Sequence, residues 1–243
     1  RCHNLLLQIE GALAGRDKLT IAAPRTIEAV GLWIDQLVAE STGKNGRGVI
    51  PVTGEALGEP GEYGADRLFV HLSMGDGPDE ESRNRLRDLA AAGAPFAEAR
   101  LPEPAAIAAE FVRWELATAL AGARLGVNPF DEPNVQQAKD ATARLLQAHR
   151  EGGAVPASGS ACVIGGLPGW LSRRAVDGIG GIDASRLLSM LSPGDYFAML
   201  AYLPPDPALL GPLEGVGRLV RARTAGARAV GDGPRDGDAA GRL

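Results

Sequence analysis

The sequence predicts an α/β fold: a three-layer α-β-α sandwich with a mostly parallel sheet, followed by an incomplete β-α-β piece. From Lys18 onward, short β-prone runs alternate with long helical runs, which is typical of parallel strands joined by crossover helices. Apolar residues make up 45% and charged residues 23% of the 243-residue chain, a balance typical of globular domains. At roughly 100 to 200 residues per domain, this length allows one large domain or two smaller ones.

The first expected elements are a buried strand, KLTIAAP at 18–24, and a helix at 25–41. Within that helix, apolar residues recur at helical spacing: Ile27, Val30, Ile34, Leu37 and Val38. The next expected elements are strands at 48–52, 67–73 and 96–102, a surface helix at 80–92, an Ala-rich helical stretch at 104–127 and a helix from Pro133. Proline suits a first helical turn because the N–H that it lacks has no intrahelical partner there.

Regular structure is harder to predict beyond this point. Nine of the 32 residues from Glu151 to Ile182 are glycine, which favours loops. A strand at 195–204, a helix at 207–223 and a short run at 228–230 then predict the β-α-β piece. We therefore expect a helix from a preceding domain at 1–15, a sandwich domain at 16–150, a Gly-rich linker at 151–193 and a partial β-α-β segment at 194–243. This organisation, with Arg1 as the first residue, indicates part of a longer protein.

Charge and composition exclude several classes of protein. The net charge of −5 lacks the basic excess needed to neutralise many phosphates, so a nucleic-acid partner is not expected. No uncharged apolar run approaches the roughly 20 residues of a membrane helix. Two cysteines are too few for a disulfide framework, and the three histidines stand too far apart for a spaced metal motif. We expect reduced thiols, no metal and a cytoplasmic location.

The segment QLVAESTGKNG at 36–46 ends a helix in a Gly-Lys turn. It is not a nucleotide-binding P-loop, because Val38 stands where the first glycine is needed and Asn45 where Ser or Thr is needed. Gln36 and Glu40 are four residues apart and share one helical face. Glu40 lies at the helix C-terminus, where the negative end of the helix dipole favours uptake of a proton, as a general base requires. An ordinary capped helix end with a solvated Glu40 is the alternative.

The segment NPFDEPNVQQAK at 128–139 begins the second long helix. Glu132 and Lys139 are seven residues apart, two turns along one face. The chain has three lysines against 22 arginines, and an ammonium is a compact charge that a guanidinium does not replace. A solvated helix face is again the alternative. Elsewhere, we interpret Trp33 and Trp114 as core residues and four basic residues as a solvated face: Arg218, Arg221, Arg223 and Arg228.

Together, QLVAESTGK, EFVRWELATALAGARLGVNPF and FDEPNVQQAK resemble the second sugar-phosphate-isomerase (SIS) domain of phosphoglucose isomerases, from about Leu5 to Leu146. GDYFAMLAYLPPDPAL is similar to the isomerase half of bifunctional transaldolase/phosphoglucose isomerases, which extends the resemblance to about Arg235.

The resemblance implies conversion of glucose 6-phosphate to fructose 6-phosphate through a cis-enediol, with neither a metal nor an organic cofactor. Glu40 falls on the family's carboxylate that moves the proton between C1 and C2. Lys139 falls on its lysine for ring opening, and Gln36 on its phosphate-side glutamine. The resemblance also implies substrate contacts for four further residues: Ser41, Gly43, Lys44 and Glu132. A homodimer and the parent's N-terminal SIS and transaldolase domains are the partners that we expect.

Three departures from the family accompany this resemblance. The ring-opening histidine has no counterpart, because the chain reads YGADR at 63–67 and DGDAAGRL after Gly233, Pro234 and Arg235. Glu132 replaces a glutamine and brings a second anion near the phosphate. The resemblance covers the second SIS domain and not the first, which supplies the family's phosphate cradle. The leading hypothesis is therefore an incomplete isomerase module, and the rival is a non-catalytic sugar-phosphate-binding or oligomerisation module.

Overall fold

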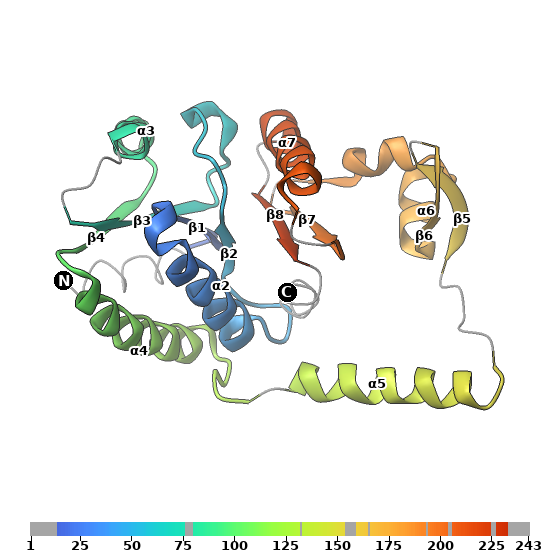
Figure 1. Cartoon of the computed structure of the whole chain (residues 1–243). Coiled ribbons are helices and arrows are strands. Elements are labelled where there is room, and N and C mark those ends of the chain that lie inside the picture. The colour runs from blue at the N-terminus through green and yellow to red at the C-terminus, as the bar shows by residue number, and fades with distance from the viewer. Residues whose placement is uncertain are drawn as a thin grey trace. The chain divides into compact units, whose positions relative to one another are not determined.

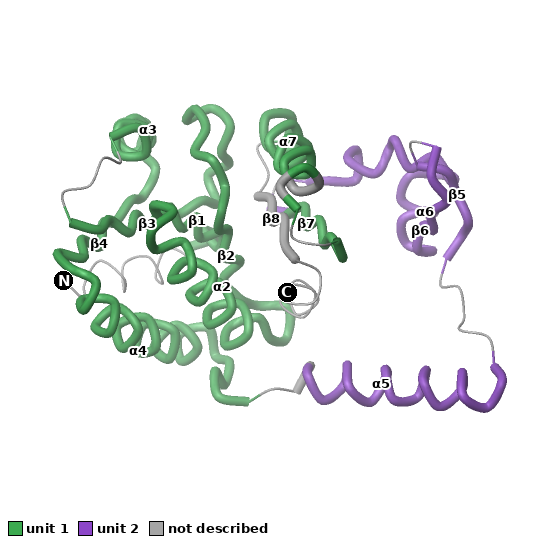
Figure 2. Tube along the Cα trace, in the orientation of Figure 1, with its two compact units in different colours: residues 1–132, 196–243 green, residues 133–195 purple. Residues whose placement is uncertain are grey.

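The computed structural model describes residues 14–75, 80–131, 133–153, 159–164, 166–192, 194–203, 206–224 and 227–232. The helix expected at 1–15 falls on residues 1–13, which lie outside the described residues, and on a turn at 14 and 15. The chain forms two compact units (Figure 2). Residues 1–132 and 196–243 make up the first unit, and residues 133–195 make up the second.

The first unit contains a four-stranded sheet in the order β2-β1-β3-β4 (Figure 1). Its strands are β1 (Lys18–Ala22), β2 (Ile50–Thr53), β3 (Arg67–Met74) and β4 (Phe96–Leu101), and every neighbouring pair is parallel. In the register, Lys18 of β1 lies opposite both Ile50 of β2 and Arg67 of β3. The chain therefore places β2 on one side of β1, and then reverses to add β3 and β4 on the other side.

This reversal produces three layers. Parallel crossovers are right-handed, so connections that move in opposite directions along a sheet place their helices on opposite faces. The helix α2 (Glu28–Thr42), which follows the short 3-10 turn η1 (Arg25–Ile27), joins β1 to β2 on one face, and α3 (Glu80–Ala91) joins β3 to β4 on the other. After η3 (Pro104–Ala106), α4 (Ile107–Leu125) packs beside α2. The predicted three-layer α/β fold is confirmed.

The two faces of β3 differ in character, because successive side chains of a strand point to opposite sides. Leu68, Val70 and Leu72 enter a core that also contains Ile34 of α2 and Trp114 of α4. This confirms Trp114 as a core residue, and Trp33 packs partly buried against the same core. On the other face, Phe69 packs with two leucines of α3, Leu86 and Leu89.

The C-terminal segment forms the predicted β-α-β piece. Strands β7 (Tyr196–Ala201) and β8 (Ala227–Asp232) are parallel, and α7 (Pro207–Thr224) connects them. This segment belongs to the first unit, because α7 contacts the turn η2 (Pro60–Glu62) and β8 contacts β2. Residues far apart in the chain therefore fold into one compact unit.

The second unit replaces the expected linker with regular structure. After α5 (Pro133–Arg150), a hairpin of β5 (Ser160–Ile164) and β6 (Leu167–Leu171) leads to α6 (Arg173–Ile179) and the 3-10 helix η4 (Ala184–Met190). The prediction of a linker at 151–193 is therefore wrong for these elements. Cys162, Leu171 and Ile179 form a small core there. The boundary expected at 150 also differs, since α5 groups with this unit. Among the residues that the structure describes, no helix is long and apolar enough to cross a membrane.

We predict that Leu89→Ala lowers the free energy of unfolding by about 2 to 5 kcal/mol, because it leaves a cavity between α3 and the sheet. Leu116→Ala on α4 is the matched control and should change stability by less than about 0.5 kcal/mol. Leu89 is 1% exposed and Leu116 is 60% exposed. Urea unfolding measures both, and equal losses would contradict this assignment of the core.

Candidate functional site

The first part of the candidate site is the C-terminal end of α2. Gln36 and Glu40 lie on this helix, each partly exposed. Thr42 secures its last turn, because the Thr42 hydroxyl donates to the Val38 carbonyl (2.8 Å) and accepts from the Val49 N–H (3.0 Å). The Gly43 N–H donates to the Ala39 carbonyl at 2.9 Å. The chain therefore leaves the helix in one fixed direction immediately after Glu40 and Ser41.

A tight turn follows directly. The Lys44 N–H donates to the Arg47 carbonyl (2.9 Å), and the Arg47 N–H donates back to the Lys44 carbonyl (3.0 Å). Asn45 and Gly46 between them have φ values of 58° and 70°. Positive φ at both central residues defines a type I′ turn, for which Asn-Gly is the preferred pair. Lys44 and Arg47 therefore face each other across the turn.

Both of these cations bind the segment 125–131, which begins at the last residue of α4. The Lys44 ammonium contacts the main-chain carbonyls of Asn128 and Asp131, each at 2.5 Å, and the Asp131 carboxylate at 2.8 Å. The Arg47 guanidinium donates to the carbonyl of Leu125 at 3.0 Å. That carbonyl belongs to the last turn of α4, where carbonyls lack helical partners and cations are favoured.

These contacts bring together two of the sequence-predicted segments. Lys44 lies four residues after Glu40, and Asp131 immediately precedes Glu132, so the Gly-Lys turn and the start of the second motif meet. Glu132 itself lies outside the described residues. Lys139 is exposed on α5, in the other unit. Lys44 is only 5% exposed, and its ammonium already contacts Asn128 and Asp131. Its role in binding substrate therefore stays a prediction.

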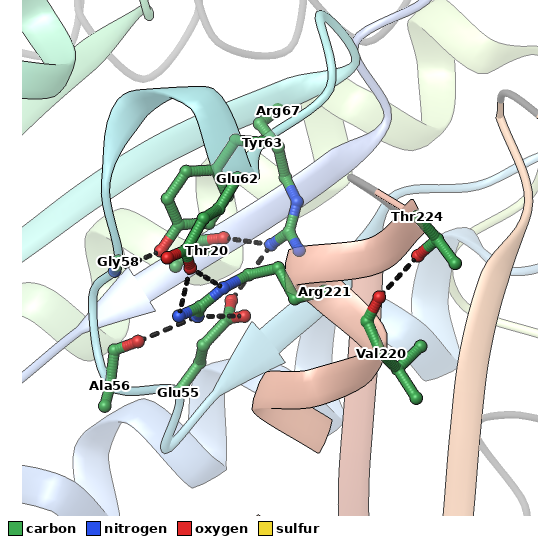
Figure 3. Close-up of polar contacts among 10 residues, drawn as sticks. All are labelled: Thr20, Glu55, Ala56, Gly58, Glu62, Tyr63, Arg67, Val220, Arg221 and Thr224. Carbon is green, nitrogen blue, oxygen red and sulfur yellow. Dashed lines mark hydrogen bonds and ion pairs between the residues drawn. The ribbon is translucent and has the colours of Figure 1, made fainter. Parts of the chain in front are cut away.

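A second polar cluster, which the sequence analysis missed, is drawn in Figure 3. It lies on the α3 side of the sheet, because its Tyr63 packs against the core of Phe69, Leu86 and Leu89. The Glu55 carboxylate contacts the guanidinium of Arg67 on β3 at 3.1 Å and that of Arg221 on α7 at 2.6 Å. Arg221 also donates to the Ala56 carbonyl at 2.8 Å and to Glu62 at 2.9 Å. The side chains of Glu55, Arg67 and Arg221 are each at most 4% exposed.

Tyr63 packs against both arginines of this cluster. The Arg67 and Arg221 guanidinium carbons are 5.2 Å and 5.1 Å from the centre of its ring, and its hydroxyl accepts from the Gly58 N–H at 2.8 Å. Burial raises the pKa of Tyr63, and the negative charge of Glu55 raises it further against the opposing effects of Gly58 and the arginines. The YGADR element therefore supplies two members of a structural ion cluster, Tyr63 and Arg67.

Arg221 corrects the sequence analysis, which assigned it to a solvated helix face. Burial lowers the pKa of Arg221, but the hydrogen bond and charge of Glu55, with Tyr63 and Glu62, outweigh this effect and the net pKa is raised. Arg218 and Arg223 are exposed as predicted, and the side chain of Arg228 lies outside the described part. Arg221 could not be distinguished from its neighbours in the sequence, because its partners are more than 150 residues away.

No protein-family model matches the chain, and no curated protein matches it. Among solved structures, the chain is similar to a hypothetical protein from Thermus thermophilus, with 20% sequence identity and a TM-score of 0.48. The match covers 58% of this chain and 44% of the Thermus chain, so the chain spans less than half of that protein. A similarity at this level indicates no function, and the fold class stands on the strand order and register of the sheet.

We predict that Glu55→Gln lowers the free energy of unfolding by about 3 to 5 kcal/mol, because two guanidinium groups then lose their shared buried counter-charge. Glu59→Gln is the matched control, since Glu59 pairs with Arg85 at the surface, where an ion pair contributes about 1 kcal/mol or less. Urea unfolding followed by tryptophan fluorescence measures both variants. A loss at Glu55 no larger than that at Glu59 would show that the cluster does not stabilise the fold.

The raised pKa of Tyr63 predicts a pH dependence of stability. The folded state keeps the Tyr63 proton above the ordinary pKa of 10.0, so its contribution is complete below that pH and is lost as the pH rises through the folded pKa. Wild-type stability should therefore fall more steeply than that of Tyr63→Phe between about pH 10 and pH 11. Urea unfolding at pH 9, 10 and 11 checks this, and parallel curves would refute the assignment.

Proposed function

We propose that this chain is the C-terminal isomerase portion of a phosphoglucose isomerase of the transaldolase-fused kind, located in the cytoplasm. The observation that carries the proposal is the contact between Lys44 and Asp131. It joins the ends of two segments that resemble the family, one carrying Glu40 and the other leading to Glu132. Random resemblance of two short segments gives no reason for them to meet in the fold.

The distribution of the lysines also supports the proposal. Lys18 is buried between Asp17 and Asp66, with its ammonium 2.7 Å and 3.4 Å from their carboxylates, and Lys44 is buried against Asp131. Lys139, the proposed substrate lysine, is instead exposed. The lysine that the resemblance assigns to the sugar is therefore the one whose side chain reaches solvent.

In the proposed reaction, Glu40 acts as the base of an aldose-ketose isomerisation. Its carboxylate takes the proton from C2 of the open-chain aldose, the electrons move into the C1–C2 bond, and the C1 oxygen gains a proton to give the cis-enediol. The same carboxyl group then returns a proton to C1 while the O2 proton leaves, which yields the ketose. Such a base must be held close to the carbon and screened from bulk water. Gln36, Ser41 and Gly43 are proposed to bind substrate beside it, and the resemblance assigns Lys139 to the sugar oxygens.

One structural observation favours the rival, a non-catalytic sugar-phosphate-binding or oligomerisation module. Where the family has a histidine-bearing element, Tyr63 and Arg67 are committed to the buried cluster around Glu55. These two side chains are therefore not available to open the sugar ring, and we expect this chain alone to show negligible turnover of fructose 6-phosphate in a coupled assay. Turnover near that of a complete isomerase would contradict this expectation.

Proton transfer by Glu40 can be tested separately from ring opening. Erythrose 4-phosphate is a suitable probe, because its phosphorylated terminal oxygen cannot close a ring. We expect the chain to accelerate exchange of solvent deuterium into C2 of this aldose, measured by proton NMR. Glu40→Gln should reduce the enzymatic rate by about 100- to 10,000-fold, the usual contribution of a general base.

Glu28→Gln, at the other end of α2, is the control and should exchange at the wild-type rate. Binding of the aldose without exchange in the wild-type chain would favour the non-catalytic module. Exchange that persists in Glu40→Gln would assign the base elsewhere.

A further inference from the structure

We infer that Lys44 and Arg47 are positioning residues, which hold the segment 125–131, and with it Asp131, against the end of α2 that carries Glu40. This inference rests on the proposed function and deepens it. The resemblance implies that Lys44 contacts substrate, whereas in the structure its ammonium contacts two main-chain carbonyls and the Asp131 carboxylate. Arg47 has no assigned role.

The turn explains why both side chains act on the same segment. Lys44 and Arg47 form an antiparallel bridge across Asn45 and Gly46. Residues directly opposite each other in such a pair project from the same side. Arg47 binds the last turn of α4 through the Leu125 carbonyl, and Lys44 binds the later residues Asn128 and Asp131. The segment is therefore held at both of its ends.

Close packing on α4 fixes the middle of the segment. A Cβ atom added to Gly122 would lie 3.0 Å from three ring atoms of Pro129, so only glycine allows this approach without displacement. Gly126 ends α4 in the left-handed conformation, with φ of 72°, and the Val127 N–H donates to the Gly122 carbonyl at 2.9 Å. The position of Asp131 thus depends on a few defined contacts.

The salt dependence of binding distinguishes a positioning role from direct binding of phosphate. The positive charge of Lys44 is matched by the Asp131 carboxylate at 2.8 Å and by two carbonyl oxygens. A direct phosphate contact would add a salt-dependent attraction to binding, whereas a positioning residue acts through geometry. Arg47 holds the other end of the same segment through the Leu125 carbonyl, so its loss should mimic the loss of Lys44.

The test uses the whole chain and two measurements. The first is amide hydrogen exchange by mass spectrometry, in which Lys44→Met and Arg47→Met should accelerate exchange at Val127 and Phe130 roughly tenfold or more, since hydrogen bonds to charged groups are lost. Exchange in β1 and β3 should stay unchanged. Arg87→Met on the exposed side of α3 is the control variant and should leave both regions as in the wild type. Asp131→Asn keeps the two carbonyl contacts of Lys44 and should give a smaller effect than Lys44→Met.

The second measurement is the affinity for fructose 6-phosphate by calorimetric titration at 50 and 200 mM salt. We expect both Lys44→Met and Arg47→Met to weaken binding at least fivefold, with the wild-type dependence on salt. A flattened salt dependence confined to Lys44→Met would overturn the inference in favour of direct phosphate contact, and wild-type affinity in both variants would also overturn it. Absence of binding by the wild-type chain would instead overturn the proposed function, and with it the positioning role.

Discussion

Glu55 holds two buried guanidinium groups, and the attachment of the C-terminal segment to the sheet depends on it. Arg67 belongs to β3 and Arg221 to α7, so one carboxylate joins segments that are more than 150 residues apart (Figure 3). A buried cation without a counter-charge is unfavourable by several kcal/mol, of order 3 to 5 when one partner of a pair is removed. The burial of each arginine therefore depends on the Glu55 carboxylate, and α7 lies where Arg221 can reach that carboxylate.

The two faces of the sheet are held to their neighbours by different kinds of contact. On the side of α2 and α4, apolar side chains of β1 and β3 pack into a continuous core. On the other side, the guanidinium of Arg67 contacts Thr20 and Glu55, so buried polar contacts stand beside the small core of Phe69, Leu86 and Leu89. Hydrophobic packing tolerates substitution of similar volume, whereas a buried ion cluster requires each partner. The candidate site is built on the apolar side, at the end of α2, and its own cations are again used to hold the main chain.

Much of the fold could be predicted from the sequence, because its signals are local. The alternation of strands and helices and the apolar face of α2 each depend on neighbouring residues. The hairpin of β5 and β6 was missed because its glycines were interpreted as loop residues. Gly169 lies opposite Cys162, where an added Cβ would be 3.0 Å from Ile164, so glycine there serves close packing within a strand.

The candidate site was only partly predictable, for a related reason. Position along a helix placed Gln36 and Glu40 on one face, and the structure retains that arrangement. The partners of Lys44 and Arg221 lie more than 80 residues away, so nothing near either residue distinguishes a buried cation from a solvated one. Three-dimensional contacts, rather than residue type, decide which cations remain accessible to solvent.

Amide chemical-shift mapping by NMR, with fructose 6-phosphate added to the whole chain, tests the central claim most directly. The account predicts saturable shifts centred on Gln36 to Lys44 and on Asp131, with inorganic phosphate giving weaker shifts at a subset of the same amides. Shifts that cluster elsewhere, or no shifts at millimolar concentrations of the sugar phosphate, would contradict the claim that this end of α2 is a sugar-phosphate site.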